Sequence, residues 1–268
     1  MPLARVDDFD LYYELVDCTE PWRPAVPPLL FIHGLGGDHT MWFYQVAAFC
    51  TRFPVLTFDL RGHGRSTRPD TPFGMADFAR DAAGLLRVLG FDRAHVVGLS
   101  LGGMVAQQLA LAHAEVVTSV VIADSLCGVP PEFEEAMRTA LRFIEENDMR
   151  TVARARITNA FSDQVNPALR EHVIDLVARN DKRCYEHSAR AAMGFACGEQ
   201  LSGVRAPALV LVAEEDRVTP PALSDMIAAR LPNARLVRLP RGGHINNMEC
   251  PQEFNRAVGE FLDHVQRR

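Results

Sequence analysis

The chain has 268 residues, of which 48% are hydrophobic, which suits one large core, or one core that carries an inserted smaller unit. Its net charge is −6, and acidic and basic residues are mixed along the whole length, which argues against a nucleic-acid-binding face and a polybasic membrane patch. We therefore expect a small-molecule partner and leave a homo-oligomer open.

The six cysteines are scattered and form no CxxC pair, so the sequence indicates neither a metal site nor a disulfide framework. The opening residues, MPLARVDDFDLYYELV, lack the apolar stretch of a signal peptide. The most apolar long stretch, residues 94–114, is interrupted by polar side chains and suits a buried strand followed by a helix. Reduced thiols and a cytoplasmic location are expected.

Short apolar runs alternate with amphipathic stretches, a pattern typical of a mostly parallel sheet with helices on both faces. Ala4–Val16 predicts an antiparallel hairpin or edge pair. Further strands are expected at 29–32, 55–58, 95–98, 119–122, 208–212 and 234–239, and helices at 40–51, 75–89, 101–113, 220–231 and 251–266.

Residues 127–200 differ from the rest of the chain. They show helical spacing, many charges and no convincing strand, with glycines and prolines at both borders. This pattern predicts a helical insertion between two halves of an α/β core, residues 1–126 and 201–268.

Residues 96–104 read VVGLSLGGM and place Ser100 between a predicted strand and a predicted helix. A Gly-x-Ser-x-Gly sequence at such a junction indicates a sharp, strained turn, because the small residues Gly98 and Gly102 let neighbouring segments approach closely. The turn would expose the Ser100 hydroxyl at the carboxyl edge of the sheet, beside the free N–H groups of a helix N-terminus. A glycine-rich turn with an incidental serine is the alternative interpretation.

A serine hydroxyl becomes a nucleophile when a base takes its proton and a carboxylate orients that base. His244 is the candidate base because a glycine pair presents it directly after the last predicted strand. Asp216 and Asp124 both end predicted strands, and both satisfy the order Ser, Asp, His. We prefer Asp216 as the acid and keep Asp124 as the alternative.

The loop FIHGLGG follows the first parallel strand, and its glycines let backbone N–H groups turn inward. We expect the N–H groups of Leu35 and Leu101 to bind the charge that develops on an attacked carbonyl oxygen. His33 is expected to brace this loop instead of transferring a proton. The candidate lining residues of a substrate pocket are His33, Gly34, Trp42 and Asp124.

Taken together, these elements make the chain resemble the α/β-hydrolase fold family over nearly its whole length. The motifs that carry the resemblance are HGLG at 33–36, DLRGHGRS at 59–66, GLSLGG at 98–103, Asp216 with Pro220, and Gly243-His244 followed by Glu249-x-Pro251-x-x-Phe254. The resemblance implies an eight-stranded, mostly parallel sheet, a triad of Ser100, Asp216 and His244, and a helical cap formed by residues 127–200. The segment at 59–66 usually shapes a turn in this family, so we expect a scaffold role for it.

The resemblance also narrows the reaction. Haloalkane dehalogenases and epoxide hydrolases of this fold have an aspartate where this chain has Ser100, which disfavours those activities. A serine implies an acyl-enzyme formed from an ester, a lactone or a similar carbonyl compound, with no metal and no organic cofactor.

Within the family, LGGDHTMW at 35–42 and GLSLGGM at 98–104 are similar to 3-oxoadipate enol-lactonases, which open a small carboxylated lactone. A generic carboxylesterase is nearly as well supported. The arginines of the predicted cap that could hold a substrate carboxylate are Arg138, Arg142, Arg154, Arg156 and Arg190, although helical arginines are more often solvated.

Two other classes stay open. Carbon-carbon bond hydrolases of this fold share the triad, but their close relatives commonly have a tryptophan directly after the histidine, where this chain has Ile245. A ligand receptor that retains the triad but turns over little substrate is the second.

Overall fold

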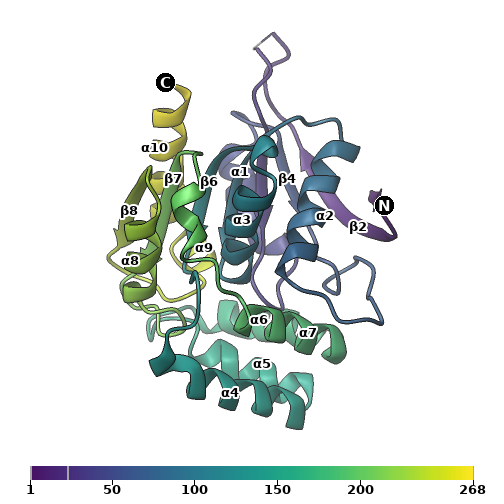
Figure 1. Cartoon of the computed structure of the whole chain (residues 1–268), viewed down its shortest axis with the longest axis vertical. Coiled ribbons are helices and arrows are strands. Elements are labelled where there is room, and N and C mark those ends of the chain that lie inside the picture. The colour runs from purple at the N-terminus through teal and green to yellow at the C-terminus, as the bar shows by residue number, and fades with distance from the viewer. Residues whose placement is uncertain (1, 23, 268) are drawn as a thin grey trace.

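The computed structural model describes residues 2–22 and 24–267 and shows an α/β fold (Figure 1). The strands are β1 Leu3–Val6, β2 Phe9–Val16, β3 Leu29–Ile32, β4 Val55–Phe58, β5 Ala94–Leu99, β6 Val117–Ala123, β7 Ala208–Ala213 and β8 Ala234–Leu239. Within these residues they form one eight-stranded sheet in the order β1-β2-β4-β3-β5-β6-β7-β8. Strands β3 to β8 are parallel, whereas β2 is antiparallel to both β1 and β4. The predicted mostly parallel sheet and its antiparallel edge pair are confirmed.

Ten α-helices are assigned in the described part of the chain: α1 Phe43–Phe49, α2 Met75–Val88, α3 Leu101–Ala112, α4 Pro131–Glu146, α5 Met149–Thr158, α6 Pro167–Ala178, α7 Lys182–Met193, α8 Pro221–Arg230, α9 Asn246–Glu249 and α10 Pro251–Gln266. Short 3-10 turns occur at η1 His39–Trp42, η2 Ala114–Val116 and η3 Gln200–Gly203. No helix among the described residues combines the length and the apolar character that a membrane crossing requires.

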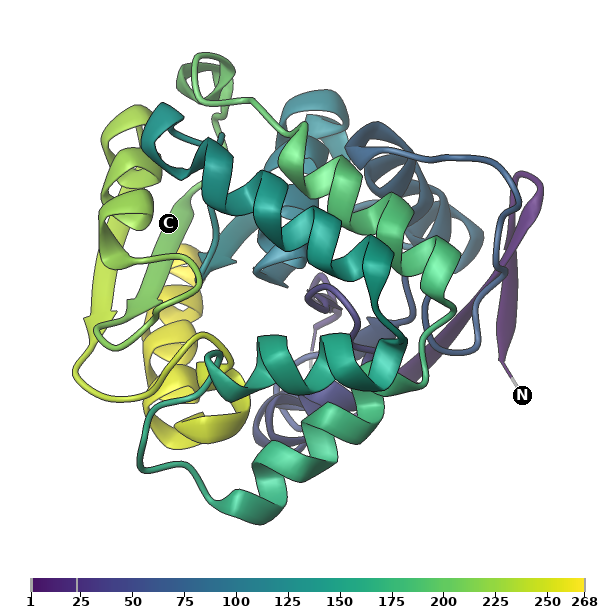
Figure 2. The same cartoon turned by 90° about the horizontal axis from the view of Figure 1, so that it is seen from below.

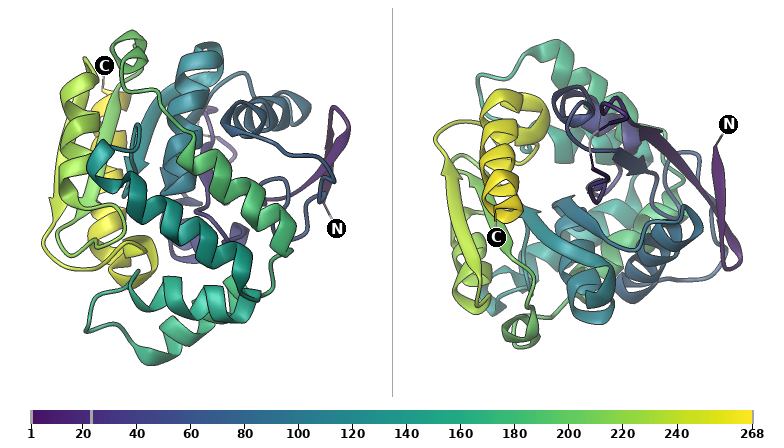
Figure 3. Two further views of the ribbon diagram at one scale, coloured as in Figure 1. Left: turned by 60° about the horizontal axis from the view of Figure 1, so that its bottom comes forward. Right: turned by 90° about the horizontal axis from the view of Figure 1, so that it is seen from above.

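The sheet is covered on both faces (Figure 3). Alternate residues of the central strands point to opposite sides, so Val96 packs with α2, α3 and α8 in one buried cluster. Val97 packs with α1 and α10 in the other buried cluster. Because the parallel strands are buried on both faces, they read as continuous apolar runs in the sequence.

One helical prediction needs correction, and one short helix was not predicted. The helix expected at 40–51 is divided into η1 and α1, because the Asp38 side chain accepts a hydrogen bond from the Thr40 N–H and starts a tight turn. Helix α9 was not expected at all. It is separated from α10 by Cys250, whose φ of −126° and ψ of 56° interrupt the helix directly before Pro251.

Helices α4 to α7 form a layer of their own at one end of the sheet, seen at the bottom of Figure 1 and in front in Figure 2. This end carries Ser100 after β5 and His244 after β8, so it is the carboxyl edge of the parallel strands. The two ends of segment 127–200 meet in an antiparallel bridge between Gly128 and Ala196. Buried side chains of this layer, among them Val152 and Ile157, join the same apolar cluster as Phe31 of β3.

Candidate active site

Ser100 lies at a sharp turn between β5 and α3. Its φ is 56° and its ψ is −115°, a left-handed conformation that costs a non-glycine residue roughly 1–3 kcal/mol. A Cβ atom on Gly98 would lie 2.1 Å from the Gly102 carbonyl oxygen, and one on Gly102 would lie 2.0 Å from the Ile32 carbonyl oxygen. The two glycines therefore permit the close backbone contacts on which this turn depends.

His244 reaches Ser100 from the loop after β8. Its Nε2 atom lies 2.8 Å from Ser100 Oγ. The loop is held by Glu249, whose carboxylate accepts a hydrogen bond from the Gly243 N–H at 2.8 Å. His244 itself is buried, with 7% of its surface exposed, so the imidazole is fixed between the sheet edge and the helical layer.

Asp216, after β7, is on the other side of the imidazole. Its Oδ2 atom lies 2.9 Å from His244 Nδ1 and accepts a hydrogen bond from the Thr219 hydroxyl at 2.7 Å. Burial alone would raise the pKa of Asp216, but the charge of His244 and these hydrogen bonds outweigh it and lower that pKa. Asp216 is therefore a carboxylate at neutral pH that can orient the imidazole and stabilise its protonated form.

Asp124, the alternative acid, is fully buried beside this group. It accepts hydrogen bonds from the Ala213 N–H at 3.0 Å and from the Asn246 side chain at 2.6 Å. Burial, with the nearby charge of Asp216, raises the pKa of Asp124 well above its usual value. Asp216, not Asp124, makes the hydrogen bond with His244.

The N–H groups of Leu35 and Leu101 donate to no group among the described residues. Leu101 opens α3 directly after Ser100, where helix N–H groups have no partner within the helix. A Cβ atom on Gly34 would lie 3.4 Å from Ser100 Cβ, so the loop that carries Leu35 runs directly beside the serine. The two N–H groups are thus available to a ligand near Ser100.

Two cavities open onto Ser100. The larger, of about 420 Å³, has an apolar lining that includes Met104, Phe133, Met137 and Leu223. The smaller, of about 50 Å³, lies between Ser100, His244, Tyr185 and Arg156. A substrate carbonyl at Ser100 would therefore have room for an apolar group on one side and a small group on the other.

Of the four predicted pocket residues, only Gly34 lines a cavity beside Ser100. Trp42 is completely buried in the core against Phe31 and Phe254, where its ring fills space under the sheet. His33 is buried as well and accepts a hydrogen bond from the Leu60 N–H at 3.0 Å, which is the bracing role expected for it. Asp124 lies behind Asp216, out of reach of either cavity.

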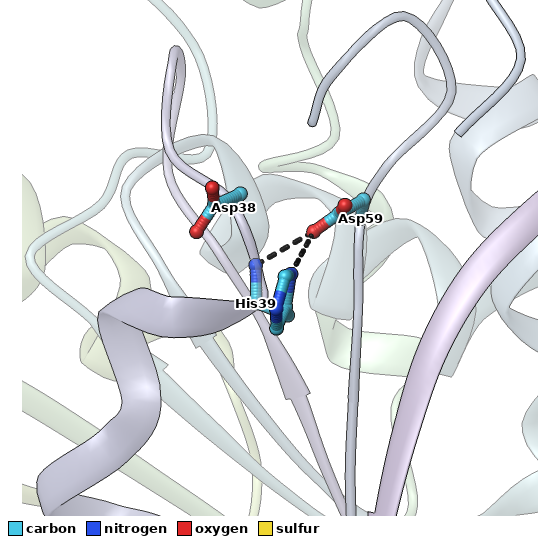
Figure 4. Close-up of side chains that lie close together, drawn as sticks. All are labelled: Asp38, His39 and Asp59. Carbon is cyan, nitrogen blue, oxygen red and sulfur yellow. Dashed lines mark hydrogen bonds and ion pairs between the residues drawn. The ribbon is translucent and has the colours of Figure 1, made fainter. Parts of the chain in front are cut away.

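Asp38, His39 and Asp59 form a cluster whose donor atoms lie within 4.8 Å of one another, the kind of group that could hold a metal ion (Figure 4). Asp59 directly follows β4 and accepts hydrogen bonds from the His39 N–H and from His39 Nδ1, both at 2.7 Å. It also accepts one from the Arg65 N–H at 2.8 Å. These bonds tie His39 and Arg65 to Asp59 and support the 59–66 turn, the scaffold role expected for that segment.

Comparison with known proteins bears on this arrangement. Residues 27–251 match the family model described as the alpha/beta hydrolase fold. The chain belongs to the α/β-hydrolase fold family. The relatives of this α/β hydrolase include "Putative carbamate hydrolase RutD" of Azorhizobium caulinodans, 28% identical over 99% of both chains, and 3-oxoadipate enol-lactonase 2 of Acinetobacter baylyi, 28% identical over 87% of both.

Among known structures, this α/β hydrolase is similar to the enol-lactonase of Burkholderia xenovorans LB400. The TM-score is 0.88, with 29% sequence identity, and the match covers 98% of this chain and 100% of the other. The resemblance that the loop and serine motifs predicted is confirmed, and hydrolase activity is supported.

The sequence interpretation missed Thr219 and Tyr185, and it did not separate Arg156 from the other four candidate arginines of segment 127–200. Thr219 follows Asp216 by three positions and binds its carboxylate, a spacing that marks a turn in which a short side chain bonds back to an aspartate. Tyr185 and the distinct position of Arg156 have no comparable signal, because helical spacing does not tell which side chain of a charged helix faces a cavity.

Proposed function

We propose that this α/β hydrolase is a serine hydrolase that cleaves a small ester or lactone through an acyl-enzyme. The observation that carries the proposal is the continuous chain of hydrogen bonds from Asp216 through His244 to Ser100, at 2.9 Å and 2.8 Å. It ends on a strained serine that opens onto two cavities.

In this mechanism His244 Nε2 takes the proton of the Ser100 hydroxyl while the serine oxygen attacks the substrate carbonyl carbon. The carbonyl oxygen becomes negatively charged and accepts hydrogen bonds from the N–H groups of Leu35 and Leu101. When the tetrahedral intermediate collapses, His244 gives the proton to the leaving alkoxide. A water molecule then attacks the acyl-enzyme by the same sequence of proton transfers and releases the acid and the free serine.

The helical segment 127–200 acts in this proposal as a cap that closes the site from above. Helices α4, α5 and α7 contribute side chains to the lining of the larger cavity, so the cap determines which acyl or alcohol groups fit. Relatives named as enol-lactonases support a lactone substrate. A carbamate is the second candidate, because the name of RutD refers to one and a carbamate carbonyl is attacked by the same chemistry.

The test combines covalent labelling with a substrate panel. A fluorophosphonate should label Ser100, as mass spectrometry of the peptide that contains it would show, and Ser100→Ala should abolish both the labelling and the turnover. Small lactones, linear methyl esters and alkyl carbamates, assayed with the same preparation, separate the candidate substrates. Ester and lactone turnover that is unchanged in Ser100→Ala would refute the proposal.

A further inference from the structure

The arginines of the helical segment 127–200 fall into two groups. Four of the five that the sequence singled out form ion pairs with glutamates of the same segment: Arg138 with Glu134 and Glu135, Arg142 with Glu135, Arg154 with Glu171, and Arg190 with Glu145. These four are well exposed, so their charges are both paired and solvated. Arg156 is different. It is only partly exposed, and it makes neither an ion pair nor a hydrogen bond with any described residue.

Arg156 also occupies a distinct place. It lines both cavities that open onto Ser100. The larger cavity has a second cation, Arg217, but its guanidinium is already bound by both carboxylate oxygens of Asp163, at 3.0 and 3.1 Å. No acidic side chain is among the described residues that line either cavity. The Arg156 charge therefore faces the site without a counter-ion from the protein.

Tyr185 provides an independent observation in the smaller cavity. Only 1% of its surface is exposed, and its hydroxyl makes no hydrogen bond to any residue that the structure describes. Burial raises the pKa of Tyr185, against the opposing effect of the Arg156 charge, so the phenol keeps its proton at neutral pH. Tyr185 lines the smaller cavity, and its hydroxyl, which no described protein group binds, is available to donate a hydrogen bond to a ligand.

We propose that Arg156 and the Tyr185 hydroxyl form a carboxylate-binding subsite, and that the substrate is an ester or lactone that carries a free carboxylate. The guanidinium offers parallel N–H donors that match the two oxygens of a carboxylate, and the phenol offers a third donor. This inference rests on the proposed serine hydrolase function, because it names the substrate class of the same site.

The test compares pairs of substrate esters that differ in charge. Monomethyl succinate, glutarate and adipate are compared with methyl 4-methylpentanoate, methyl 5-methylhexanoate and methyl 6-methylheptanoate, in which an isopropyl group replaces the carboxylate of each. Release of methanol gives kcat and KM for every ester. The wild-type enzyme should prefer the anionic member of at least one pair, and the three lengths allow for the span between Ser100 and the subsite.

Arg156→Met should lower the ratio of kcat/KM for the preferred anionic ester to that for its neutral counterpart by about 10- to 100-fold, mainly through KM, as expected for a lost charge-assisted hydrogen bond. Tyr185→Phe should lower the same ratio by roughly 5-fold. Arg154→Met is the matched control, since Arg154 belongs to the same helix but pairs with Glu171, and it should leave the ratio unchanged.

A binding measurement separates this inference from the proposed function. In the Ser100→Ala background, glutarate or adipate should raise Tm, and adding Arg156→Met should abolish that increase. If Ser100-dependent turnover occurs without any preference for the anionic esters, the subsite is refuted and the serine hydrolase stands. If no ester is hydrolysed, the proposed function fails, and the Tm measurement alone decides the subsite: a rise that persists in Arg156→Met, or no rise at all, overturns it.

Discussion

Asn246 donates a side-chain hydrogen bond to the Asp124 carboxyl over a distance of 2.6 Å. Asp124 is completely buried, and burial together with the charge of Asp216 raises its pKa well above the usual value, which favours the protonated acid. An asparagine at position 124 has nearly the same shape and charge as that acid. The Asn246 amide oxygen has no partner, so the amide can turn and accept a hydrogen bond from the new side chain.

We therefore expect Asp124→Asn to keep kcat within several-fold of the wild-type value, and Asp216→Asn to lower kcat by orders of magnitude. The reason is that, of the two aspartates, Asp216 is the one that binds His244 Nδ1, and its loss removes both the orientation of the imidazole and the support for its positive charge. Steady-state kinetics with one well-hydrolysed ester distinguish the two candidate acids. A crippled Asp124→Asn enzyme beside an active Asp216→Asn enzyme would reverse our assignment of the acid.

Gly102→Ala tests the turn that presents the serine. The added Cβ would lie 2.0 Å from the Ile32 carbonyl oxygen, so β3 or α3 must shift. We expect a loss of about 3 kcal/mol of stability, equivalent to a fall in Tm of about 6–12 °C, together with reduced activity. Gly203→Ala is the control, because nothing lies within 4 Å of the atom it adds. Equal Tm values for the two variants in differential scanning calorimetry would contradict the tight-turn explanation.

The sheet could be predicted from the sequence because parallel strands that are buried on both faces are continuous apolar runs between turn residues. Strands β3, β4 and β8 have the predicted bounds, and β5, β6 and β7 extend only slightly beyond theirs. Ser100 and His244 were found for a related reason. Each directly follows a strand of this kind beside glycines, so the carboxyl edge of the sheet brings them together.

The orientations of the other side chains depend on tertiary packing, which the sequence pattern does not show. Trp42 belongs to a short stretch beside the glycine loop, and only the fold shows that its ring turns into the core instead of the cavity. Arg154 and Arg156 lie on one helix and look alike in the sequence, yet one is paired at the surface and the other lines the site. Helical periodicity shows that positions 154 and 156 lie on different faces of the helix, but it does not show which face lines the cavity.

Thr219→Val tests a positioning residue. The Thr219 hydroxyl donates to Asp216 Oδ2 at 2.7 Å, and valine keeps the shape of the side chain without that donor. We expect kcat to fall about 5- to 10-fold, the effect of one lost hydrogen bond of about 1 kcal/mol, with KM nearly unchanged. Because this bond helps to lower the pKa of Asp216, its loss should raise that pKa and move the acidic limb of the kcat profile to higher pH. Thr158→Val, which removes an exposed hydroxyl that bonds the Arg154 carbonyl, should alter neither quantity.

An unchanged pH profile in Thr219→Val, with the same fall in kcat, would assign Thr219 a purely structural role. An unchanged kcat would show that the backbone N–H of residue 219, which lies 2.9 Å from Asp216 Oδ1 and remains in the variant, is sufficient to hold the carboxylate.

The pair of His39 and Asp59 makes stability depend on pH. Burial alone would lower the pKa of His39 and raise that of Asp59. The hydrogen bond between them and the charge of Asp59 raise the pKa of His39, and the same bond, the charge of His33 and backbone N–H donors lower the pKa of Asp59. The contribution of protonated His39 to folding stability is complete below the ordinary histidine pKa of about 6.5. It is lost as pH rises through the higher pKa that His39 has in the folded protein. The contribution of the Asp59 carboxylate to folding stability is present above about pH 4. It is lost as pH falls through the lower pKa that Asp59 has in the folded protein. The ion pair is therefore most stabilising between about pH 4 and 6.5.

His39→Asn should accordingly lower Tm more at pH 5.5 than at pH 9, because asparagine offers a donor to Asp59 but no charge. We expect the two reductions to differ by about 2–4 °C, the shift that about 1 kcal/mol produces in a chain of this size. Thermal unfolding across the pH range, with the exposed His264→Asn as control, measures the difference. A reduction that is constant with pH, or larger at pH 9, would mean that His39 is neutral in the folded protein and supports the 59–66 turn by hydrogen bonding and packing alone.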